Sequence, residues 1–434
     1  MSASTPLTRR GALRRGLTMA GAIAAPCVVP SSALGRQGTP PSDRIVMGFI
    51  GVGGQGNQHI AGGPWTTRAG FLGRDDTQIV AVCDAERARR ERTRQRVNDG
   101  YAARLGKGAY KGCDAHADFR ELLARPDIDA VLIASPDHWH ALHSVLAIQA
   151  GKDVYCEKPI SLTIREARLM ARAARRYSRI LQAGTQQRSS VAFRRACELV
   201  RSGRIGRLLR VYVNVGGTSR YFDAPPQPVP RGFDWDMWLG PAPWRPYNAR
   251  IHRGWMAHRD YSGGGMTNWG AHHFDIAQWG IGADQTGPVE IVPPDGREHK
   301  LLTYRYASGV EIVHSPGYRL PGVTFVGTEG TVNTSRWYCH TEPEAIGRQP
   351  LRPGDVHLYE SHNHHDNFVG CIRTRRRPVA DIAVIARSIT LCHLGNIAYW
   401  LKRPLRWRPA AERFVADPEA DRWLDREKRA PWRL

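Results

Sequence analysis

The glycine-rich segment at residues 51–56 constrains the fold of this chain more than any other feature. It directly follows a short apolar run at residues 45–50, which predicts a buried strand, and its letters GVGGQG fit the pattern G-x-G-x-x-G. The first glycine of that pattern permits a tight turn, the second lets the backbone approach a pyrophosphate, and the third permits close helix packing. A helix start also offers free N–H groups to phosphate. The sequence therefore predicts a dinucleotide site made by Gly51, Val52, Gly53, Gly54, Gln55 and Gly56.

A second apolar run at residues 78–83 ends at Asp84, where a carboxylate can accept hydrogen bonds from the adenosine ribose. Asp84 would repel a 2′-phosphate, which favours NAD over NADP. NADP stays possible, because an arginine group that could hold the phosphate follows at once: Arg87, Arg89 and Arg90. The interval between the glycines and Asp84 is longer than the usual ~20 residues. We therefore expect a surface insertion at residues 62–77.

As far as residue 185, short apolar runs alternate with longer amphipathic segments. We expect strands at residues 129–134, 153–156 and 179–183, and helices at residues 119–123, 138–150 and from 161 onward. Thr163 and Glu166 are spaced as a capping box for the last of these helices. Such alternation predicts an α/β fold with a doubly wound parallel sheet. Ligands bind at the carboxyl edge of such a sheet, where we expect Ser135, Pro136, His138, Glu157 and Lys158.

The second half of the chain has a different pattern. Residues 208–215 predict a strand, and two hairpins are expected, at residues 301–314 and 323–333. Residues 233–269 are rich in aromatic side chains, namely Trp235, Trp238, Trp244, Tyr247, Trp255, Tyr261 and Trp269. Such rings either stack on the apolar faces of sugars or cover a hydrophobic cluster, and the sequence leaves both readings open.

Six motifs together make the chain resemble the Gfo/Idh/MocA family, named for glucose-fructose oxidoreductase and inositol dehydrogenase. They are GVGGQG at 51–56, AVCD at 81–84, ASPDHWH at 134–140, GKDVYCEKP at 151–159, GTQQR at 184–188 and GGGMTNWGAHHFD at 263–275. The resemblance implies an NAD(P)-binding Rossmann domain at residues 43–185. It also implies a substrate-binding and oligomerisation domain at residues 186–434, an α+β domain with a large open, mostly antiparallel sheet. A homo-oligomer, dimer or tetramer, is expected through that sheet.

The same resemblance assigns the acid–base work to Lys158 of the EKP motif and to His272. A histidine that titrates near neutrality suits proton exchange, and an ammonium stabilises a developing alkoxide. Four residues before His272 stands Asn268, where dehydrogenases of the family usually carry aspartate. An amide can orient His272 but cannot stabilise its imidazolium form, so the reaction type stays open, although Asp275 could compensate. The expected substrate contacts are Gln187, Arg188, Trp255, Asn268, His272 and Asp275.

These features predict an NAD(P)-dependent oxidoreductase, with tightly bound cofactor, that acts on a hydroxyl or carbonyl group of a sugar, polyol or glycoside. An alternative is a redox-assisted glycoside-cleaving enzyme. In it, transient oxidation to a keto sugar acidifies the neighbouring C–H, elimination breaks the glycosidic bond, and the bound NAD is recycled. A third hypothesis is a binding protein that keeps the dinucleotide as structure, without catalysis.

The N-terminal residues 1–35 resemble a twin-arginine export signal. Arg9 and Arg10 precede an apolar stretch at residues 17–29, and the small residues Ser31, Ser32 and Ala33 follow it. We therefore expect export to the periplasm or another extracytoplasmic compartment. No other apolar run suggests a membrane span, so no stable membrane insertion is expected after export.

Charge, cysteine and histidine patterns limit the other partners. The formal net charge of +22 comes from arginine, since the chain has only seven lysines. Without zinc-finger spacing or an RNA-binding signature, this favours a solvated basic surface and no nucleic-acid partner. The eight cysteines form no CxxC pair, which favours buried thiols. Histidines gather at residues 138–143 and 362–365 without a companion cysteine or carboxylate pattern, so no metal is expected.

Overall fold

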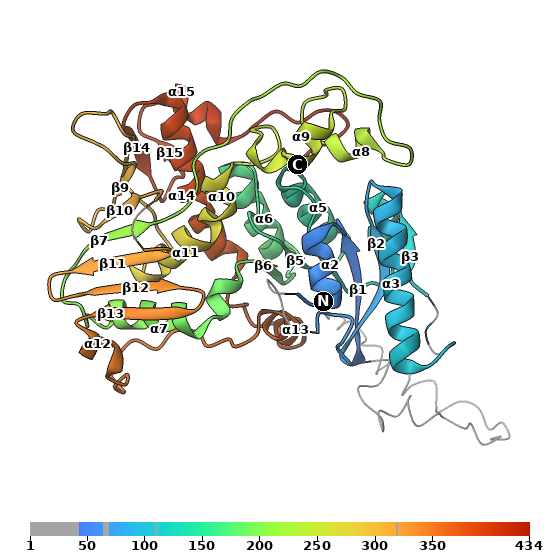
Figure 1. Cartoon of the computed structure of the whole chain (residues 1–434), viewed down its shortest axis with the longest axis horizontal. Helices are drawn as coiled ribbons and strands as arrows, with labels where there is room; N and C mark the ends of the chain where they lie inside the picture. The colour runs from blue at the N-terminus through green and yellow to red at the C-terminus, as the bar shows by residue number, and fades with distance from the viewer. Residues whose placement is uncertain (1–42, 64–68, 109, 111, 318–319) are drawn as a thin grey trace, which may run out of the picture. The chain divides into compact units, whose positions relative to one another are not determined.

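Six strands form a parallel sheet in the first half of the chain, in the order β3-β2-β1-β4-β5-β6 (Figure 1). Their bounds are β1 Ile45–Ile50, β2 Thr77–Cys83, β3 Asp114–His116, β4 Ala130–Ile133, β5 Asp153–Cys156 and β6 Leu181–Ala183. The structure, a computed structural model, describes residues 43–63, 69–108, 110, 112–317 and 320–434. The export signal predicted at residues 1–35 lies outside these ranges.

Helices connect the strands of this sheet and cover both of its faces, so the predicted doubly wound arrangement is confirmed. They are α2 (Gly54–Ala61), α3 (Arg87–Leu105), α4 (Phe119–Leu123), α5 (Asp137–Gln149) and α6 (Ile164–Arg176). The capping box at the start of α6 is present, with Thr163 accepting from the Glu166 backbone. Strand order reverses between β1 and β4, which is where open α/β sheets bind ligands.

A second sheet has nine strands in the order β13-β12-β11-β7-β10-β9-β8-β14-β15. Every pair is antiparallel except β7 with β10, which confirms a mostly antiparallel sheet. The strands are β7 Leu208–Val213, β8 Glu290–Val292, β9 Thr303–Arg305, β10 Glu311–His314, β11 Val323–Gly327, β12 Thr331–Ser335, β13 Tyr338–Glu342, β14 Leu405–Arg408 and β15 Arg413–Phe414. Both predicted hairpins are present, as β9–β10 and β11–β12.

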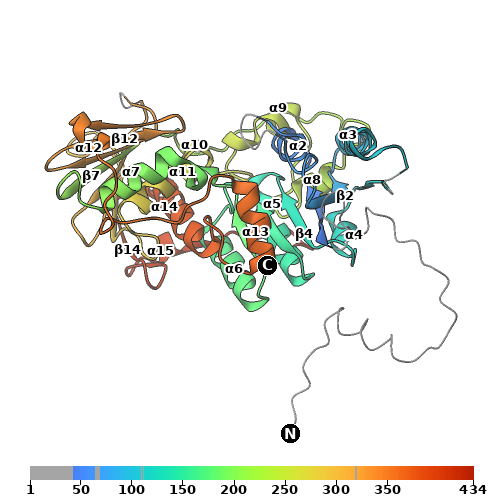
Figure 2. The ribbon, with the colours of Figure 1, turned by 90° about the horizontal axis from the view of Figure 1, so that it is seen from below.

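Three helices pack against this second sheet: α7 (Val191–Arg201), α11 (Gly270–Gly280) and α14 (Ile382–Leu401) (Figure 2). Among the described residues α14 alone is long and apolar enough to cross a membrane, and 78% of its most apolar stretch is buried inside the protein. The expectation that no apolar run beyond the N-terminus reaches this length is therefore wrong. Helix α14 is apolar along its length because it is buried in the core between α6 and α11, where a helix needs no polar face.

The C-terminal half of the chain also returns to the first sheet. The backbone N–H of Ala183 at the end of β6 donates to the Ala380 carbonyl, at 3.0 Å. The Gln182 amide of the same strand donates to the carbonyl of His364, where α13 (His364–Thr374) begins, at 2.8 Å. Residues on both sides of the expected boundary at 185 therefore build the β6 edge together.

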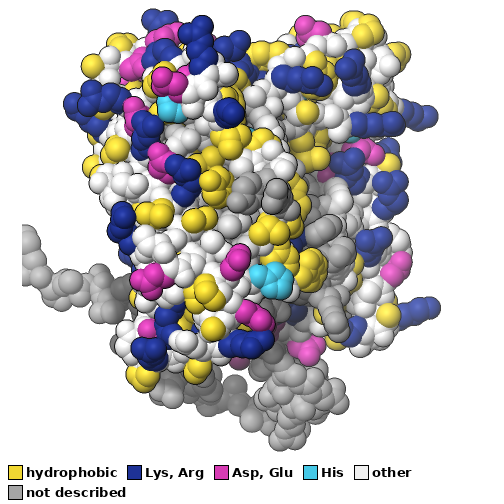
Figure 3. Space-filling view, turned by 60° about the vertical axis from the view of Figure 1, so that its left-hand side comes forward, with side chains coloured by type: hydrophobic (Ala, Val, Ile, Leu, Met, Phe, Trp, Pro, Cys, Tyr) yellow, Lys and Arg dark blue, Asp and Glu magenta, His cyan; other side chains and the backbone are white. Residues whose placement is uncertain are grey.

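Basic and acidic side chains are interspersed on the face of the molecule that Figure 3 shows. Many of the arginines are held in local ion pairs, such as Arg210 with Glu311 and Arg403 with Asp417. The described cysteines are free thiols, and all except Cys339 are buried.

Candidate functional site

The glycine loop between β1 and α2 is built so closely that two of its positions exclude a side chain. Gly51 has φ +81°, and a Cβ there would overlap the backbone of Ser135. A Cβ on Gly56 would overlap the carbonyl oxygen of Gly51, so this glycine lets α2 close onto its own loop. Gly53 instead has open space beside it, with the nearest atom, Arg89 Nη1, 3.5 Å from an ideal Cβ.

A cavity of about 690 Å³ opens along this loop. Its lining contains most of the residues that the sequence assigns to the cofactor, namely Gly51, Val52, Gly53, Gly54, Gln55, Asp84, Ser135 and Pro136. Three arginines of α3, Arg89, Arg92 and Arg96, line it as well. This cavity fits the pyrophosphate of a dinucleotide. It offers exposed backbone at a helix start, open space at Gly53 and nearby positive charge.

Asp84 ties the second strand to the glycine loop. Its Oδ2 accepts the Val52 N–H and its Oδ1 accepts the Glu86 N–H, both at 3.0 Å. Burial raises the pKa of Asp84, and the charge of Arg89 together with these two hydrogen bonds opposes that rise only in part. Arg89 also pairs with Glu86 at 2.8 Å. The carboxylate thus faces the cavity in a fixed orientation, beside an arginine.

Lys158, Asn268 and His272 come together from the two halves of the chain. The Lys158 Nζ donates to Asn268 Oδ1 at 2.6 Å and to the Asn268 carbonyl at 3.3 Å. Burial lowers the pKa of Lys158, while the charges of Glu157 and Asp137 raise it in part. His272 is only 2% exposed, and its Nδ1 has no hydrogen-bond partner among the described residues. Burial and the charges of Lys158 and Arg336 hold the pKa of His272 well below its usual value, so the imidazole is neutral.

Glu157, expected at the cofactor, is buried beneath the site and holds the EKP loop in place. Its Oε1 lies 2.7 Å from His59 Nε2 and accepts the Gln186 amide at 3.0 Å, and its Oε2 accepts the Lys158 N–H at 3.0 Å. Burial raises its pKa, but the hydrogen bond and charge of His59 and the charge of Lys158 outweigh it, and the pKa is lowered. Glu157 is therefore a carboxylate anion that positions the backbone of Lys158 through its N–H.

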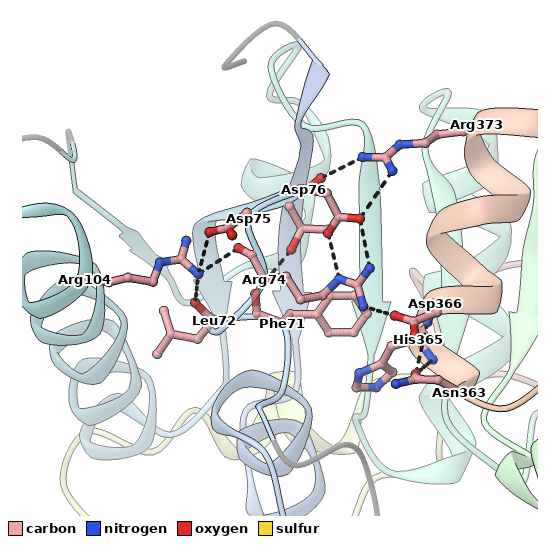
Figure 4. A network of polar contacts seen from close by, with 11 residues as sticks. Phe71, Leu72, Arg74, Asp75, Asp76, Arg104, Asn363, His365, Asp366 and Arg373 are labelled. Carbon is pink, nitrogen blue, oxygen red and sulfur yellow. Dashed lines mark hydrogen bonds and ion pairs between the residues drawn. The ribbon is translucent and has the colours of Figure 1, made fainter. Parts of the chain in front are cut away.

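The His59 contact extends into a network that fixes α13 (Figure 4). His59 Nδ1 lies 2.8 Å from His365 Nε2, and the ring of His365 stacks on Phe71 at 4.2 Å between centroids. Arg74 pairs with Asp76 at 2.8 Å and also with Asp366. Residues 69–76 thus include the fully buried Phe71 and join α13 to the first sheet. In the described part of the expected surface insertion, Phe71 points into the core while Ala69, Gly73 and Asp75 are exposed.

Two expected substrate contacts bind each other instead of meeting Lys158. Arg188 donates to both carboxylate oxygens of Asp275 at 2.8 Å, and to Asp284 at 2.8 Å. Ser388 also donates to Asp275, at 2.6 Å, so this carboxylate does not reach His272 as a compensating anion. The structure therefore does not bring Arg188 and Asp275 to the Lys158 site, because a buried charge needs its own partner.

His138 and Gln187 take different positions. His138 does not line the cofactor cavity: its Nε2 contacts the Trp238 carbonyl at 3.0 Å, and the ring packs against Trp238 and Tyr261. Gln187 is 3% exposed, and neither atom of its amide has a hydrogen-bond partner among the described residues. Gln187 thus keeps unused polar capacity, as a substrate contact would.

The aromatic segment divides between packing and the site. Most of its rings belong to a buried cluster that includes Trp235, Trp238, Tyr247 and Tyr261. Trp255 is partly buried and lines the cofactor cavity, and Trp269 is 41% exposed beside His272, with 5.9 Å between ring centroids. Among the described residues, no three His, Cys, Asp or Glu side chains converge as metal ligands.

Two residues near Lys158 were missed from the sequence. Asp137 is 3% exposed and accepts the Ser262 hydroxyl at 2.6 Å, and burial raises its pKa to about 7. Its place next to the expected His138 was the available signal. Arg336 lies in the turn between β12 and β13, with its guanidinium carbon 5.0 Å from the Trp269 ring centroid. No motif marks that turn, so the sequence gives no signal for Arg336.

Comparison with known proteins agrees with this geometry. The family model described as "Oxidoreductase family, NAD-binding Rossmann fold" matches residues 45–185, and "Oxidoreductase family, C-terminal alpha/beta domain" matches residues 197–434. The chain belongs to the Gfo/Idh/MocA oxidoreductase family. Its first domain is an NAD-binding Rossmann domain, so the predicted cofactor is confirmed as NAD.

Individual relatives are more distant. A glycosyl hydrolase family 109 protein from a Shewanella species is 31% identical over 173 residues, which cover 37% of this chain and 34% of that protein. Inositol 2-dehydrogenase 1 of Saccharopolyspora erythraea is 29% identical over 204 residues, covering 45% and 54%. These alignments thus span about a third to a half of the curated relatives. Aldose-aldose oxidoreductase from Caulobacter crescentus superposes with a TM-score of 0.55 at 18% identity, over 84% of this chain and 99% of that one, which shows a shared fold.

Proposed function

We propose that this protein is an NAD-dependent oxidoreductase, with NADP as the alternative cofactor, that interconverts a hydroxyl and a carbonyl group on a sugar, polyol or glycoside. The observation that carries the proposal is the half-buried Lys158, whose Nζ lies 2.6 Å from Asn268 Oδ1 and is grouped with neutral His272. Lys158 follows β5, at the same carboxyl edge of the sheet as the glycine loop and Ser135. A hydroxyl bound to Lys158 therefore lies on the cofactor's side of the sheet.

The roles of the side chains follow from their charges. NAD, when bound, supplies the two-electron acceptor for the carbinol C–H bond. Lys158, with its lowered pKa, takes the hydroxyl proton at Nζ when neutral and returns it in the reverse direction. Asn268 fixes that nitrogen by accepting one of its hydrogens, and His272 offers Nδ1 as a hydrogen-bond partner for a second polar group of the substrate.

The substrate class rests on the relatives and on the aromatic rings. Inositol 2-dehydrogenase and aldose-aldose oxidoreductase are named for polyol and sugar substrates. Trp269 and Trp255 offer rings on which the apolar face of a sugar can stack. Gln187, with its buried amide, is a further candidate for a substrate hydroxyl.

A second candidate function is redox-assisted glycoside cleavage. One observation favours it: a relative is named as a glycosyl hydrolase family 109 protein. In this case oxidation acidifies the adjacent C–H, elimination breaks the glycosidic bond and leaves a C=C bond, water adds to that bond, and the same hydride returns to the carbonyl carbon. Free sugar would then appear without net NADH.

The setting of the reaction is also part of the proposal. The twin-arginine pattern at residues 8–14 supports export of the folded protein, with the cofactor tightly bound, to the periplasm or another extracytoplasmic compartment. We further propose a homo-oligomer, dimer or tetramer, formed through the second sheet.

The test is an absorbance assay at 340 nm with NAD and a panel of sugars, polyols and glycosides. Stoichiometric NADH formation supports oxidation, and sugar release without NADH selects the cleaving alternative. Lys158→Met should lower either activity by about 10² to 10⁴, the range of general acid–base catalysis. Activity that Lys158→Met leaves unchanged would contradict the assigned role of Lys158.

A further inference from the structure

A segment from the second half of the chain forms part of the wall of the cofactor cavity. We define the strap as residues 232–255, which include the short helices α8 (Trp235–Leu239) and α9 (Ala249–Arg253). Figure 1 shows both helices above α5. The cavity that the glycine loop lines is also lined by five strap residues, namely Met237, Trp238, His252, Arg253 and Trp255. The dinucleotide site therefore has a wall that lies outside the Rossmann domain.

The strap begins with backbone hydrogen bonds to the loop that follows Asp84. The Asp234 N–H donates to the Ala85 carbonyl at 3.0 Å, and the Arg87 N–H donates to the Gly232 carbonyl at 2.8 Å. Asp84 and Ala85 both line the cofactor cavity. One end of the strap is thus fixed beside the carboxylate that suits the adenosine ribose.

The middle of the strap is attached to helix α5. The Trp238 carbonyl accepts the indole N–H of Trp139 at 3.0 Å and the Nε2–H of His138 at 3.0 Å. A Cβ on Gly240 would overlap the Trp139 ring, so the strap packs directly on α5 at this point. His138, which the sequence assigned to the cofactor, therefore meets the strap instead.

Arg429, near the C-terminus, holds the same part of the strap. Its backbone N–H donates to the Pro241 carbonyl at 3.0 Å. Its guanidinium donates to the Gly240 carbonyl at 2.9 Å, to the Asp236 carboxylate at 2.5 Å and to the Asp236 carbonyl at 3.0 Å. Arg429 does not line the cofactor cavity. Its side chain can therefore influence a bound dinucleotide only through the strap.

We propose that the strap is part of the cofactor site, that it covers the bound dinucleotide, and that Arg429 is the positioning residue that keeps it in place. This inference rests on the proposed function, because it takes NAD to bind along the glycine loop. Contacts between the dinucleotide and the strap are lost when the strap moves away from α5. The hydrogen bonds that attach the strap therefore slow the release of the cofactor.

The experiment measures the rate at which NADH leaves the protein. NADH-loaded protein is mixed with a large excess of NAD, and the change in nicotinamide fluorescence with time gives the dissociation rate. We expect Arg429→Gln to release NADH about 10- to 100-fold faster than the native protein, as for the loss of hydrogen bonds from a charged group. Arg429→Lys should keep part of the slow release, because it keeps the charge beside Asp236.

Arg413→Gln is the matched control. Arg413 pairs with Asp421 at 3.0 Å, and neither residue belongs to the strap or lines the cofactor cavity. This variant loses a surface ion pair of the same kind and should release NADH at the native rate. Circular dichroism checks that each variant folds.

Met237→Ala tests the contact of the strap with the cofactor itself. Met237 lies on α8 and lines the cavity. We expect its truncation to speed NADH release about 4- to 15-fold, which corresponds to one or two buried methylene groups. This variant decides the matter if Arg429→Gln does not fold.

Hydrogen–deuterium exchange gives a readout of the strap that needs no variant. Bound NADH should slow exchange at the backbone amides of residues 232–255, and Arg429→Gln should weaken this protection. The inference is overturned if Arg429→Gln and Met237→Ala both release NADH at the native rate, or if bound NADH leaves exchange in the strap unchanged.

Failure of the proposed function gives a different result. If NADH protects the strap and both variants release it faster, but the NAD-loaded protein transforms no sugar, polyol or glycoside, the strap stands and the assigned chemistry is wrong. If the native protein transforms such a substrate and both variants release NADH at the native rate, the chemistry stands and the strap inference is wrong.

Discussion

Replacing Asn268 by aspartate should raise the pKa of Lys158 strongly. In the native protein the Lys158 ammonium meets a neutral amide oxygen at 2.6 Å, and burial lowers its pKa. Asn268→Asp changes that oxygen into part of a carboxylate with almost no change of volume. The positive form of Lys158 then gains a direct ionic partner, and the neutral form, which accepts the substrate proton, becomes less populated.

The size of the effect follows from the distance. Two unit charges 2.6 Å apart attract each other by about 6 kcal/mol at an effective dielectric constant of 20. A pKa change of 1 corresponds to about 1.4 kcal/mol, so the pKa of Lys158 can rise by at most about 5. Desolvation of the new carboxylate reduces this, and a carboxylate beside a buried cation commonly shifts a pKa by about 1 to 3. We expect a rise of that size.

Competitive acetylation measures the pKa without any knowledge of the substrate. The protein is labelled with isotopic acetic anhydride from pH 6 to pH 11, digested, and analysed by mass spectrometry for the fraction of Lys158 modified. Lys428, which pairs with Glu166 at 3.1 Å, serves as an internal reference in the same chain. Asn268→Leu is the control, because it removes the amide without adding charge and should not raise the midpoint.

In Asn268→Asp the acetylation midpoint of Lys158 should lie about 1 to 3 pH units above its native midpoint. The acetylation midpoint of Lys428 should be unchanged. An unchanged or lower midpoint would refute the reasoning. It would mean that Lys158 does not face residue 268 in solution, and that the proposed assembly of the site is incorrect.

Further predictions concern stability and the pH profile. The raised pKa of Asp137, about 7 against an ordinary 3.8, means that the folded state holds this proton more tightly than the unfolded state. The free energy of unfolding should therefore fall as pH rises from 4 to 7, by up to about 4 kcal/mol. Asp137→Asn should remove this loss, as measured by denaturant titrations at pH 5 and pH 8. If the native protein and Asp137→Asn differ in unfolding free energy by the same amount at both pH values, the prediction is contradicted. Arg188→Met should lower the free energy of unfolding by about 3–5 kcal/mol, since it leaves buried Asp275 without its ionic partner; a loss below 1 kcal/mol would show that the pair is not buried. If Lys158 is the base, log kcat for alcohol oxidation should rise with pH and level off below pH 10.5, the ordinary pKa of lysine, because burial lowers this pKa; a rate that falls with rising pH would exclude that role.

Much of the first sheet could be predicted because its information is local. Every strand except β3 is a short apolar run, and the glycine loop and capping box are fixed by neighbouring residues. The strand β3 was missed because its three residues, Asp-Ala-His, form no apolar run and pair only at the sheet edge. The site residues Lys158, Asn268 and His272 stand in motifs, and the structure brings these three together.

The remainder depends on contacts between distant parts of the chain. No local pattern shows that Arg188 meets Asp275, or that Phe71 stacks on His365. A basic residue in a motif and a basic residue in a buried ion pair look the same in sequence. Arg336 lies in the hairpin turn between β12 and β13, and only its contact with the Trp269 ring in the folded chain places it near the site.

The central claim is that the crevice beside the glycine loop holds the dinucleotide, and titration of the protein with NADH, followed by nicotinamide fluorescence, tests it most directly. Gly53→Val places a branched side chain in the open space beside Arg89, and Gly354→Val places the same group on an exposed loop where nothing lies within 4 Å. We predict saturable binding to the native protein and to Gly354→Val, with at least about tenfold weaker binding to Gly53→Val, as loss of backbone contact with the pyrophosphate requires. NADH that binds none of the three, or binds Gly53→Val as tightly as the native protein, would contradict the account.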